Sequence, residues 1–325
     1  MKAVVVRAFG APESFHVEEV ADPPVAPQDV RVRVRTSAVN FVDGLVSSGA
    51  YQVRPDLPFT PGGEFAGIVD TVGADVTGLS PGQRVCGSTI RGAWGELVTL
   101  NAALVFPIPE SMTFVEAGAF RVSNATAYHA LVQRAALRAG ETVLVLGAGG
   151  AVGFAAVQIA KALGAQVVAS ASTPEKRSLA ADAGADAVVD ARAPDWREQV
   201  KQAAGGRVDV VVDPVGGEMT ELAFRCLGWG GRHLVIGFAA GAIPRLPTNL
   251  ALVKGAALIG VDIRQFSLLE PTASAANMRA LFQLYQEGRL ITAPARIFPL
   301  ENFAEAMNAV NNGEIVGRAL LTVSD

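Results

Sequence analysis

The stretch that most constrains this chain is a glycine-rich turn directly after an unbroken apolar run. TVLVLG (Thr142–Gly147) has the composition of a strand buried on both faces, and it leads into AGGAVG and a helix expected over about 150–163. In the fingerprint G-x-G-x-x-G the three glycine positions fall at Ala148, Gly150 and Gly153, so the strict pattern fails by one methyl group. Gly150 still lets a pyrophosphate approach the backbone, and Gly153 still lets helix and strand pack closely. The backbone amides expected to hold the phosphates are those of Gly149, Gly150, Ala151 and Val152.

This turn stands inside a long alternation of apolar strands and helical segments. The alternation predicts an α/β domain over 122–264, built on a doubly wound parallel sheet. Before it, from Met1 to about Leu104, short β-branched runs broken by proline and glycine predict a compact β-domain. DVRVRVRTS (Asp29–Ser37) alternates strictly, which predicts a half-buried strand with valines on one face and arginines on the other. The segment 111–138 has a helical pattern, and we expect it to open on a Ser111 cap without a capping-box acid.

Composition narrows the function classes. The chain has 325 residues, 50% of them hydrophobic, and a formal net charge of −4. This acidic balance argues against an electrostatic grip on nucleic acid or on an anionic membrane. The opening apolar run is too short for a secretory signal, and no stretch reaches the roughly 18 consecutive apolar residues of a membrane span. Cys86 and Cys226 lie far apart and have no partners at metal-ligand spacing, so we expect a cytoplasmic, reducing environment.

The segment ASASTPEKR (Ala169–Arg177) carries hydroxyls and cations where many dinucleotide-binding chains carry an acid. An acid near position 170 would bind the ribose 2′-hydroxyl of NAD and repel a 2′-phosphate. Ser170 and Ser172 cannot repel a phosphate, and Lys176 or Arg177 can neutralise it, with Lys176 the better candidate. The same segment also has the pattern of a capping box that starts at Ser172, and the two interpretations are compatible. The sequence therefore favours NADPH over NADH.

Five blocks of sequence occur here in the order of one known family. They are SAVNFVDGLVSSGAY, LPFTPGGEFAGIVDTVGADVTGLSPGQRV, SNATAYHALV, GETVLVLGAGGAVGFAAVQIAKALGA and GEIVGRALLT. With them the chain resembles the medium-chain dehydrogenase/reductase superfamily, and within it the zinc-free quinone oxidoreductases related to zeta-crystallin. The resemblance covers essentially the whole length.

The resemblance implies a fold and a set of site residues. The fold is a GroES-like β-barrel catalytic domain at 1–121, completed by 265–325, and a Rossmann domain at 122–264 that binds NADPH. The site residues it implies are Asn40 and Tyr51 at the nicotinamide end, Thr126 beneath the nicotinamide, Gly149, Gly150, Ala151 and Val152 at the pyrophosphate, Ser172 and Lys176 at the 2′-phosphate, and Phe238 and Ala239 at the carboxamide. Two departures stand out. Ala191 replaces a tyrosine of some relatives near the adenosine, so that Arg192 or Arg177 would have to substitute, and Arg264 lies in the substrate cleft where relatives have an apolar or aromatic residue.

A catalytic zinc is not expected. Zinc-dependent relatives supply a cysteine and a histidine at the places that Asn40 and Gly63 occupy here. None of the three histidines (His16, His129 and His233) lies within four residues of another histidine or a cysteine, whereas zinc needs about three converging ligands. Without a Lewis acid, oxidation of an alcohol is disfavoured.

The reaction that remains is transfer of a hydride from NADPH to a small-molecule quinone or α,β-unsaturated carbonyl. Tyr51 matches the place of a proton donor in the enoyl-thioester reductase branch, but it can equally be a wall residue while solvent supplies the proton. Two alternatives remain open: an enoyl-thioester reductase acting on a CoA or carrier-protein substrate, and an NADPH-binding protein with incidental catalysis. The resemblance also implies a homodimer, formed through edge strands near AALIGVDI (256–263).

Overall fold

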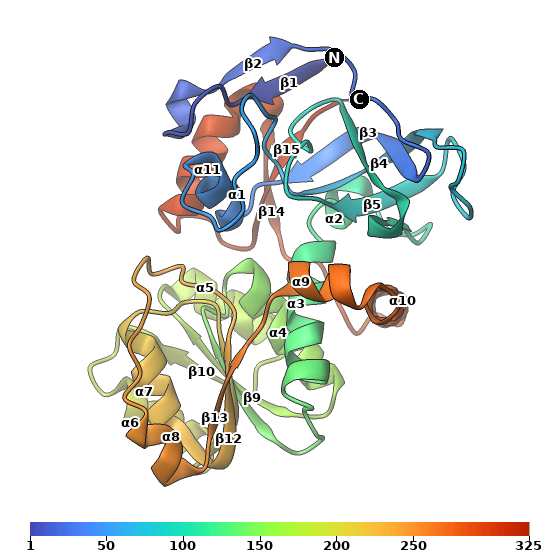
Figure 1. The fold of residues 1–325 in the computed structure, drawn as a ribbon. Helices are drawn as coiled ribbons and strands as arrows, with labels where there is room; N and C mark the ends of the chain where they lie inside the picture. Colours follow the sequence, from blue (N-terminus) through green and yellow to red (C-terminus); the bar gives the residue numbers. More distant parts are fainter. Residues whose placement is uncertain (325) are drawn as a thin grey trace. The chain divides into compact units, whose positions relative to one another are not determined.

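The computed structural model describes residues 1–324, which divide into two compact units (Figure 1). One unit comprises Met1–Val122 and the chain from Pro294 onward, and the other comprises Ser123–Ala293. The sequence placed the second boundary at 264/265, whereas the contacts place it at 293/294. Segment 265–293 therefore belongs to the second unit.

The second unit is built on a six-stranded parallel sheet whose order is β10-β9-β8-β11-β12-β13. Its strands are β8 (Thr142–Leu146), β9 (Gln166–Ala171), β10 (Ala187–Asp190), β11 (Val208–Asp213), β12 (Leu227–Val235) and β13 (Ala257–Gly260). The order reverses between β8 and β11, and a doubly wound sheet binds its ligand outside the carboxyl ends of the strands at such a point.

Helices cover both faces of this sheet (Figure 1). The helices packed on the sheet are α4 (Ala151–Ala162), α5 (Pro174–Asp182), α6 (Trp196–Ala203), α7 (Glu218–Cys226) and α8 (Asn249–Lys254). The chain also forms α3 (Arg121–His129), α9 (Ile263–Leu269) and α10 (Pro271–Gln286). β8 is buried along its whole length because helices lie on both of its faces, as its unbroken apolar run predicted. On one face Leu144 and Val211 pack with Trp196 and Phe224 in a single apolar cluster.

The helical segment 111–138 is divided, and its predicted start was wrong. α2 (Phe114–Ala117) is capped by Thr113, whose side chain accepts from the backbone N–H of Glu116 in a capping box. The cap predicted at Ser111 lies two residues too early, and the capping box that was not expected there is formed by Thr113 and Glu116. After α3 the chain continues as a π-helical segment, Ala130–Arg134.

The first unit carries a seven-stranded sheet of order β14-β15-β3-β4-β5-β7, in which β6 also pairs with β3. The strands are β3 (Asp29–Ala38), β4 (Glu64–Val72), β5 (Arg84–Ser88), β6 (Leu97–Asn101), β7 (Val105–Pro107), β14 (Ala295–Pro299) and β15 (Arg318–Thr322), and a separate pair is formed by β1 (Lys2–Val5) and β2 (His16–Glu19). In β3 the valines are fully buried and the arginines lie on the opposite face, so the alternation predicted for this strand is confirmed.

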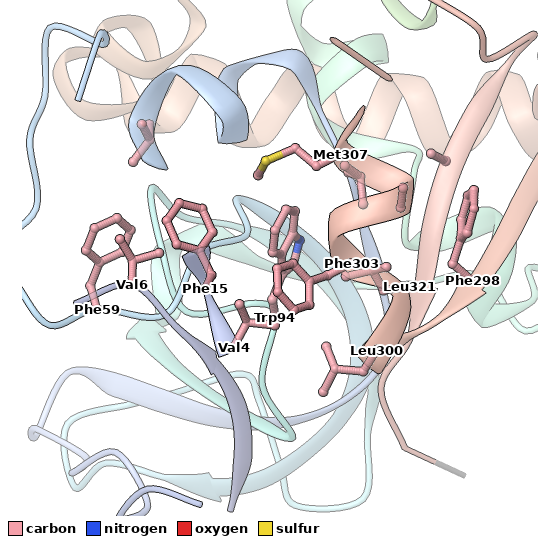
Figure 2. Close-up of a cluster of buried hydrophobic side chains, with 14 residues drawn as sticks. Val4, Val6, Phe15, Phe59, Trp94, Phe298, Leu300, Phe303, Met307 and Leu321 are labelled. Carbon is pink, nitrogen blue, oxygen red and sulfur yellow. The ribbon is translucent and has the colours of Figure 1, made fainter. Parts of the chain in front are cut away.

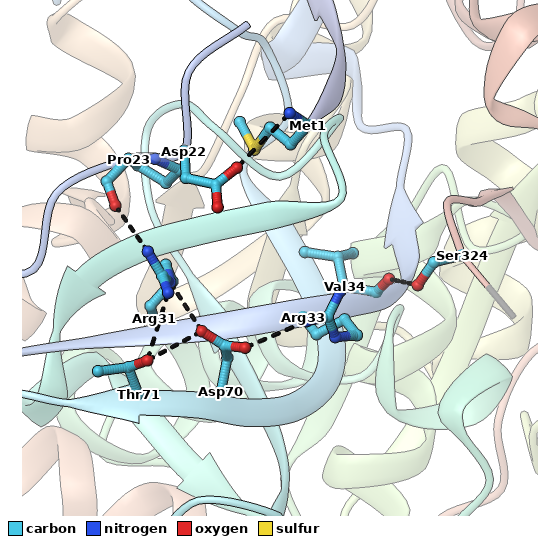
Figure 3. A network of polar contacts seen from close by, with 9 residues as sticks. All are labelled: Met1, Asp22, Pro23, Arg31, Arg33, Val34, Asp70, Thr71 and Ser324. Carbon is cyan, nitrogen blue, oxygen red and sulfur yellow. Dashed lines mark hydrogen bonds and ion pairs between the residues drawn. The ribbon is translucent and has the colours of Figure 1, made fainter. Parts of the chain in front are cut away.

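Two of the three arginines of β3, Arg31 and Arg33, form ion pairs. Asp70 of β4 accepts from Arg31 Nε at 2.8 Å and from Arg33 Nη2 at 3.2 Å (Figure 3). Although desolvation raises the pKa of Asp70, the hydrogen bonds from Arg31 and Thr71 outweigh it and hold that pKa below its ordinary value. The positive charges of Arg31 and Arg33 are therefore balanced within the sheet by Asp70.

An aromatic cluster joins β1, the loop after β5 and α11 (Phe303–Asn311) within the same unit (Figure 2). Trp94 is fully buried, packs 6.2 Å from the ring of Phe303 and donates its indole N–H to the carbonyl of Ala38. Val46 of α1 (Phe41–Ser47) belongs to the cluster, and the ring of Tyr51 packs against it. The cluster therefore fixes the segment that carries Asn40 and Tyr51.

Candidate functional site

The glycine turn lies at the carboxyl end of β8 and leads directly into α4. Gly147 has φ +61°, a left-handed conformation that favours glycine, and Gly150 is the N-cap of α4. A Cβ on Gly153 would lie 2.7 Å from the backbone carbonyl carbon of Gly147, so only glycine permits this approach of helix and strand. The structure therefore requires glycine at position 153.

Position 148 tolerates its alanine because the methyl group points into the core. Ala148 is fully buried, and its N–H donates to the carbonyl of Ser170 at 3.0 Å. A Cβ on Gly150 would meet nothing closer than 3.4 Å, so the backbone there is open to a ligand. The N–H of Gly150, however, donates to the carbonyl of Gly147 at 2.9 Å. The helix-start amides that remain for an anion are therefore those of Gly149, Ala151 and Val152.

The hydroxyl residues at the end of β9 and just after it do not form the capping box predicted at Ser172. α5 is capped by Thr173, whose Oγ1 accepts from the N–H of Lys176 at 3.3 Å, so the predicted cap at Ser172 was wrong by one residue. Ser170 accepts from the indole N–H of Trp196 at 2.8 Å and is buried. Within residues 1–324 the hydroxyl of Ser172 makes no hydrogen bond, which leaves it available to a ligand.

Lys176 and Arg177, the two positively charged residues of this segment, have different neighbours. Arg177 forms an ion pair with Asp190 at 2.9 Å. A Cβ on Gly149 would lie 2.8 Å from Lys176 Cγ and 2.9 Å from Lys176 Cα, so the start of this lysine side chain lies against the glycine turn. Burial lowers the pKa of Lys176, and the positive charge of Arg192 lowers it further. The structure therefore gathers Gly149, Lys176 and Arg192 at one place, while Arg177 is committed elsewhere.

The loop after β12 offers one donor and one acceptor. Two other backbone groups of this loop are already bonded within the protein: Ala239 donates its N–H to the carbonyl of Pro214 at 3.2 Å, and the carbonyl of Phe238 accepts from the N–H of Gly241 at 2.8 Å. Among the described residues the N–H of Phe238 and the carbonyl of Ala239 have no partner. This pair can donate one hydrogen bond and accept another.

Two other candidates of the second unit lie on helices. Thr126 is buried in α3. Arg264 is in the first turn of α9, 3.8 Å from the carboxylate of Asp262, which caps that helix through the N–H of Gln265. The contact of Thr126 and Arg264 with a ligand stays a prediction.

In the first unit, Asn40 begins α1 and is fixed from two sides. Its backbone N–H donates to Asp43 Oδ2 at 2.7 Å, and its side-chain Nδ2 donates to Glu64 Oε2 at 3.1 Å. Glu64 is fully buried and also accepts from Arg318 at 2.7 Å and from the N–H of Val122 at 2.7 Å. No local pattern in the sequence indicates this role of Glu64, since its partners lie up to 254 residues away.

Asp43 and Tyr51 complete this part of the structure. Burial raises the pKa of Asp43 to about 7, with a smaller contribution from the negative charge of Glu64. Tyr51 donates its backbone N–H to the carbonyl of Leu45 at 3.0 Å, and its hydroxyl makes no hydrogen bond within the described chain. Its phenol can therefore donate to a ligand.

Within residues 1–324, no group of three or more His, Cys, Asp or Glu side chains could hold a metal ion. His129 stacks on Phe266 at 3.9 Å between ring centroids, and His233 bonds Asp213 at 2.9 Å. Over the same residues, none of the helices has both the length and the apolar character needed to cross a membrane.

Comparison with known proteins agrees with this architecture. Residues 26–110 match the family model of the alcohol dehydrogenase GroES-like domain, and residues 151–279 match that of the zinc-binding dehydrogenases. The chain is 37% identical to mouse (Mus musculus) quinone oxidoreductase-like protein 2 over 94% of its length and 88% of that protein. It is 32% identical to human (Homo sapiens) quinone oxidoreductase over 99% of its length and 97% of that protein.

A solved structure gives the same result. The Escherichia coli quinone oxidoreductase complexed with NADPH superposes with a TM-score of 0.91 at 27% identity, covering 99% of this chain and all of that one. The predicted fold class, a GroES-like domain with a Rossmann domain, is confirmed. The chain belongs to the zinc-independent quinone oxidoreductase family of the medium-chain dehydrogenase/reductase superfamily.

Proposed function

We propose that this oxidoreductase uses NADPH to reduce a quinone or an α,β-unsaturated carbonyl compound. The observation that carries the proposal is the packing of Lys176 against Gly149, beside Arg192, at the carboxyl edge of the β8–β9 region. Lys176 would therefore lie both against the turn proposed to bind the pyrophosphate and at the adenosine end of the cofactor. Bound NADPH would supply the hydride, and the residues of the chain would bind, orient and supply protons.

The preference for NADPH over NADH rests on charge. Burial is the main cause of the lowered pKa of Lys176, and the positive charge of Arg192 lowers it further, so a 2′-phosphate between the two cations would offset their repulsion. The hydroxyl of Ser172 would add a hydrogen bond. Arg177 does not serve, because Asp190 already pairs with it.

The nicotinamide end is proposed to lie at the loop after β12. A carboxamide carries one carbonyl acceptor and one NH₂ donor. The N–H of Phe238 and the carbonyl of Ala239 are the complementary pair, which would fix which face of the ring is presented. Thr126 would lie beneath the ring, and Arg264 would line the acceptor side.

On the substrate side we propose that Asn40 and Tyr51 meet the acceptor or the nicotinamide ribose. Because Glu64 takes one amide hydrogen of Asn40, that side chain is held in one orientation. Reduction of an enone leaves an enolate that needs a proton, and the phenol of Tyr51 is the proposed donor. A Tyr51→Phe variant that keeps full turnover on an enone would show that solvent supplies the proton instead.

The test is consumption of NADPH and NADH followed by stopped-flow absorbance with 9,10-phenanthrenequinone, 1,4-benzoquinone, a 2-alkenal and crotonyl-CoA. We expect turnover with the first three and at least tenfold preference for NADPH, from roughly 1.5–3 kcal/mol per charge-assisted contact. Lys176→Ala and Arg192→Ala should each reduce that preference, and Arg177→Ala is the matched control that should keep it. Faster turnover of crotonyl-CoA would make the chain an enoyl-thioester reductase. Tight NADPH binding without turnover of any acceptor would leave only a binding protein.

We also propose a homodimer formed at the edge strand β13, and a cytoplasmic location from the cysteine usage of the sequence. β13 ends the six-stranded sheet, and exposed apolar side chains surround it: Leu258 on the strand, Trp229 on β12, and Leu252 and Val253 on α8. A second copy that pairs across a two-fold axis would cover them. Sedimentation equilibrium should give twice the monomer mass, and Leu258→Lys should give the monomer. A wild-type monomer at micromolar concentration would contradict the proposal.

A further inference from the structure

A buried polar cluster lies at the carboxyl end of β11, apart from the residues assigned so far. Its centre is Asp213, which is 1% exposed. Asp213 Oδ1 accepts from the N–H groups of Val215 at 2.9 Å and Gly216 at 2.8 Å. Its Oδ2 accepts from the hydroxyl of Thr220 at 2.6 Å and bonds the Nε2 atom of His233 at 2.9 Å. One carboxylate thus joins the turn after β11, the first turns of α7 and strand β12.

His233 fixes the direction of its hydrogen bond to Asp213. It is fully buried, its ring stacks on Phe224 at 5.9 Å between centroids, and its Nδ1 has no hydrogen-bond partner among the described residues. A proton on Nδ1 would have no acceptor, so the ring proton is on Nε2 and points at Asp213. Although desolvation raises the pKa of Asp213, the bonds from His233, Gly216 and Thr220 outweigh it and keep that pKa below its ordinary value.

The turn that Asp213 holds lies between the glycine turn and the loop after β12. A Cβ on Gly147 would lie 2.9 Å from Val215, so the side chain of Val215 rests on the turn after β8. A Cβ on Gly216 would lie 2.9 Å from the ring of Phe238, so position 216 meets the next loop.

Two backbone bonds complete this arrangement. Ala239 donates to the carbonyl of Pro214 at 3.2 Å, and Ala240 donates to the carbonyl of Val215 at 2.9 Å. The turn after β11 is therefore a spacer that sets the separation between the proposed phosphate site and the proposed carboxamide site.

We propose that Asp213 is a positioning residue for the nicotinamide half of the cofactor, acting through this turn on Phe238 and Ala239. The inference rests on the proposed function, because that function assigns the carboxamide to the loop after β12. A misplacement of this loop would leave the adenosine half of the site intact and would weaken only the grip on the nicotinamide half. A purely structural role would weaken both halves together or neither.

The experiment compares two ligands by isothermal titration calorimetry: NADPH, which spans both halves, and adenosine 2′,5′-bisphosphate, which reaches only the adenosine half. The variant is Asp213→Asn. It keeps the acceptor for Val215 and Gly216, which share Oδ1, and turns an NH₂ group toward the donors of Thr220 and His233. We expect the Kd for NADPH to rise about tenfold or more, as a buried donor is left without an acceptor. The Kd for the bisphosphate should stay within about twofold.

A control substitution on the same strand distinguishes a positioning role of Asp213 from a general loss of protein stability. Asp209, at the amino end of β11, accepts from the N–H of Thr142 at 2.9 Å and is also buried. Asp209→Asn should leave the ratio of the two Kd values unchanged, whatever it does to the melting temperature. Thr220→Val removes one of the four contacts of Asp213 without changing the shape of the side chain, and it should raise the same ratio by a smaller factor. It also serves if the Asp213 variant fails to fold.

An unchanged ratio in both Asp213→Asn and Thr220→Val, or in Thr220→Val alone if the first does not fold, would overturn the inference. Failure of the proposed function has a different signature. If the wild type binds NADH more tightly than NADPH, the coenzyme assignment falls, and the same ratio is then measured with NADH against adenosine 5′-monophosphate. If the wild type binds NADPH no more tightly than the bisphosphate, no nicotinamide site exists and both proposals fail.

Discussion

The buried carboxyl group of Asp43 should make the first unit less stable as the pH rises through neutrality. Asp43 is 2% exposed, and burial is the main reason that its pKa rises from 3.8 to about 7. The unfolded chain loses the Asp43 proton near pH 4, whereas the folded chain holds it until about pH 7. Between these values the folded state binds more protons than the unfolded state, so stability falls with increasing pH and levels off above the folded pKa.

The size of the effect follows from the shift. A difference of about three pH units at about 1.4 kcal/mol each gives an upper limit of roughly 4 kcal/mol for the whole window, of which about 2–3 kcal/mol falls between pH 5 and pH 8. Asp43→Asn is an uncharged substitute for the protonated form. Its advantage in stability over the wild type should therefore grow from about 1–2 kcal/mol at pH 5 to roughly 4 kcal/mol at pH 8, and the two proteins should match only near pH 4.

The assay is urea unfolding of both proteins at half-unit intervals from pH 5 to pH 8, followed by fluorescence. Asp70→Asn is the control, because the pKa of Asp70 is lowered and its contribution is present at neutral pH and lost only as the pH falls toward acid. The Asp70 variant should therefore be less stable than the wild type over the whole range. Parallel curves for Asp43→Asn and the wild type would refute the argument, since they would mean that Asp43 ionises alike in both states.

Three further outcomes are expected. Gly153→Ala should lower the melting temperature by several degrees in a thermal scan, because its Cβ would collide with the backbone of the preceding turn at an overpacking cost of about 1–3 kcal/mol; an unchanged melting temperature would show that the turn can relax. Gly149→Ala should weaken NADPH more than NADH in a fluorescence titration, because the new methyl group displaces Lys176, and equal losses would argue against a phosphate contact. Cys86 and Cys226 should react with a thiol reagent at pH 7.5 only after unfolding, since burial raises their pKa values to about 12 and about 11; rapid labelling of the native protein would contradict this.

Local pattern was enough to predict the strand–turn–helix unit around the glycine turn. An apolar run such as TVLVLG can be satisfied only between two helical layers, and Gly153 is needed wherever a helix starts this close to a strand. The alternation in β3 was legible for a similar reason, because side chains of a strand point to opposite faces in turn. These features depend on neighbours within a few residues, so the sequence contains them directly.

Choices among equivalent residues were decided by the tertiary structure. Lys176, Arg177 and Arg192 offer the same charge in sequence, but Asp190 pairs with Arg177 and the glycine turn lies against Lys176. The cap of α5 and the start of α2 each lay one or two residues from the predicted position, since several hydroxyl residues in succession compete for one cap.

The buried charges show the same limit most clearly. Glu64 and Asp213 are each held by residues distant in the chain, and the desolvation that shifts the pKa of Asp43 exists only once the unit has closed around it. The sequence by itself determined the strand–turn–helix unit to which the dinucleotide site is assigned in the proposal, because periodicity and glycine spacing are local properties. The tertiary structure alone decided which charges are buried and which are paired, because ion pairing and desolvation depend on residues that only folding brings together.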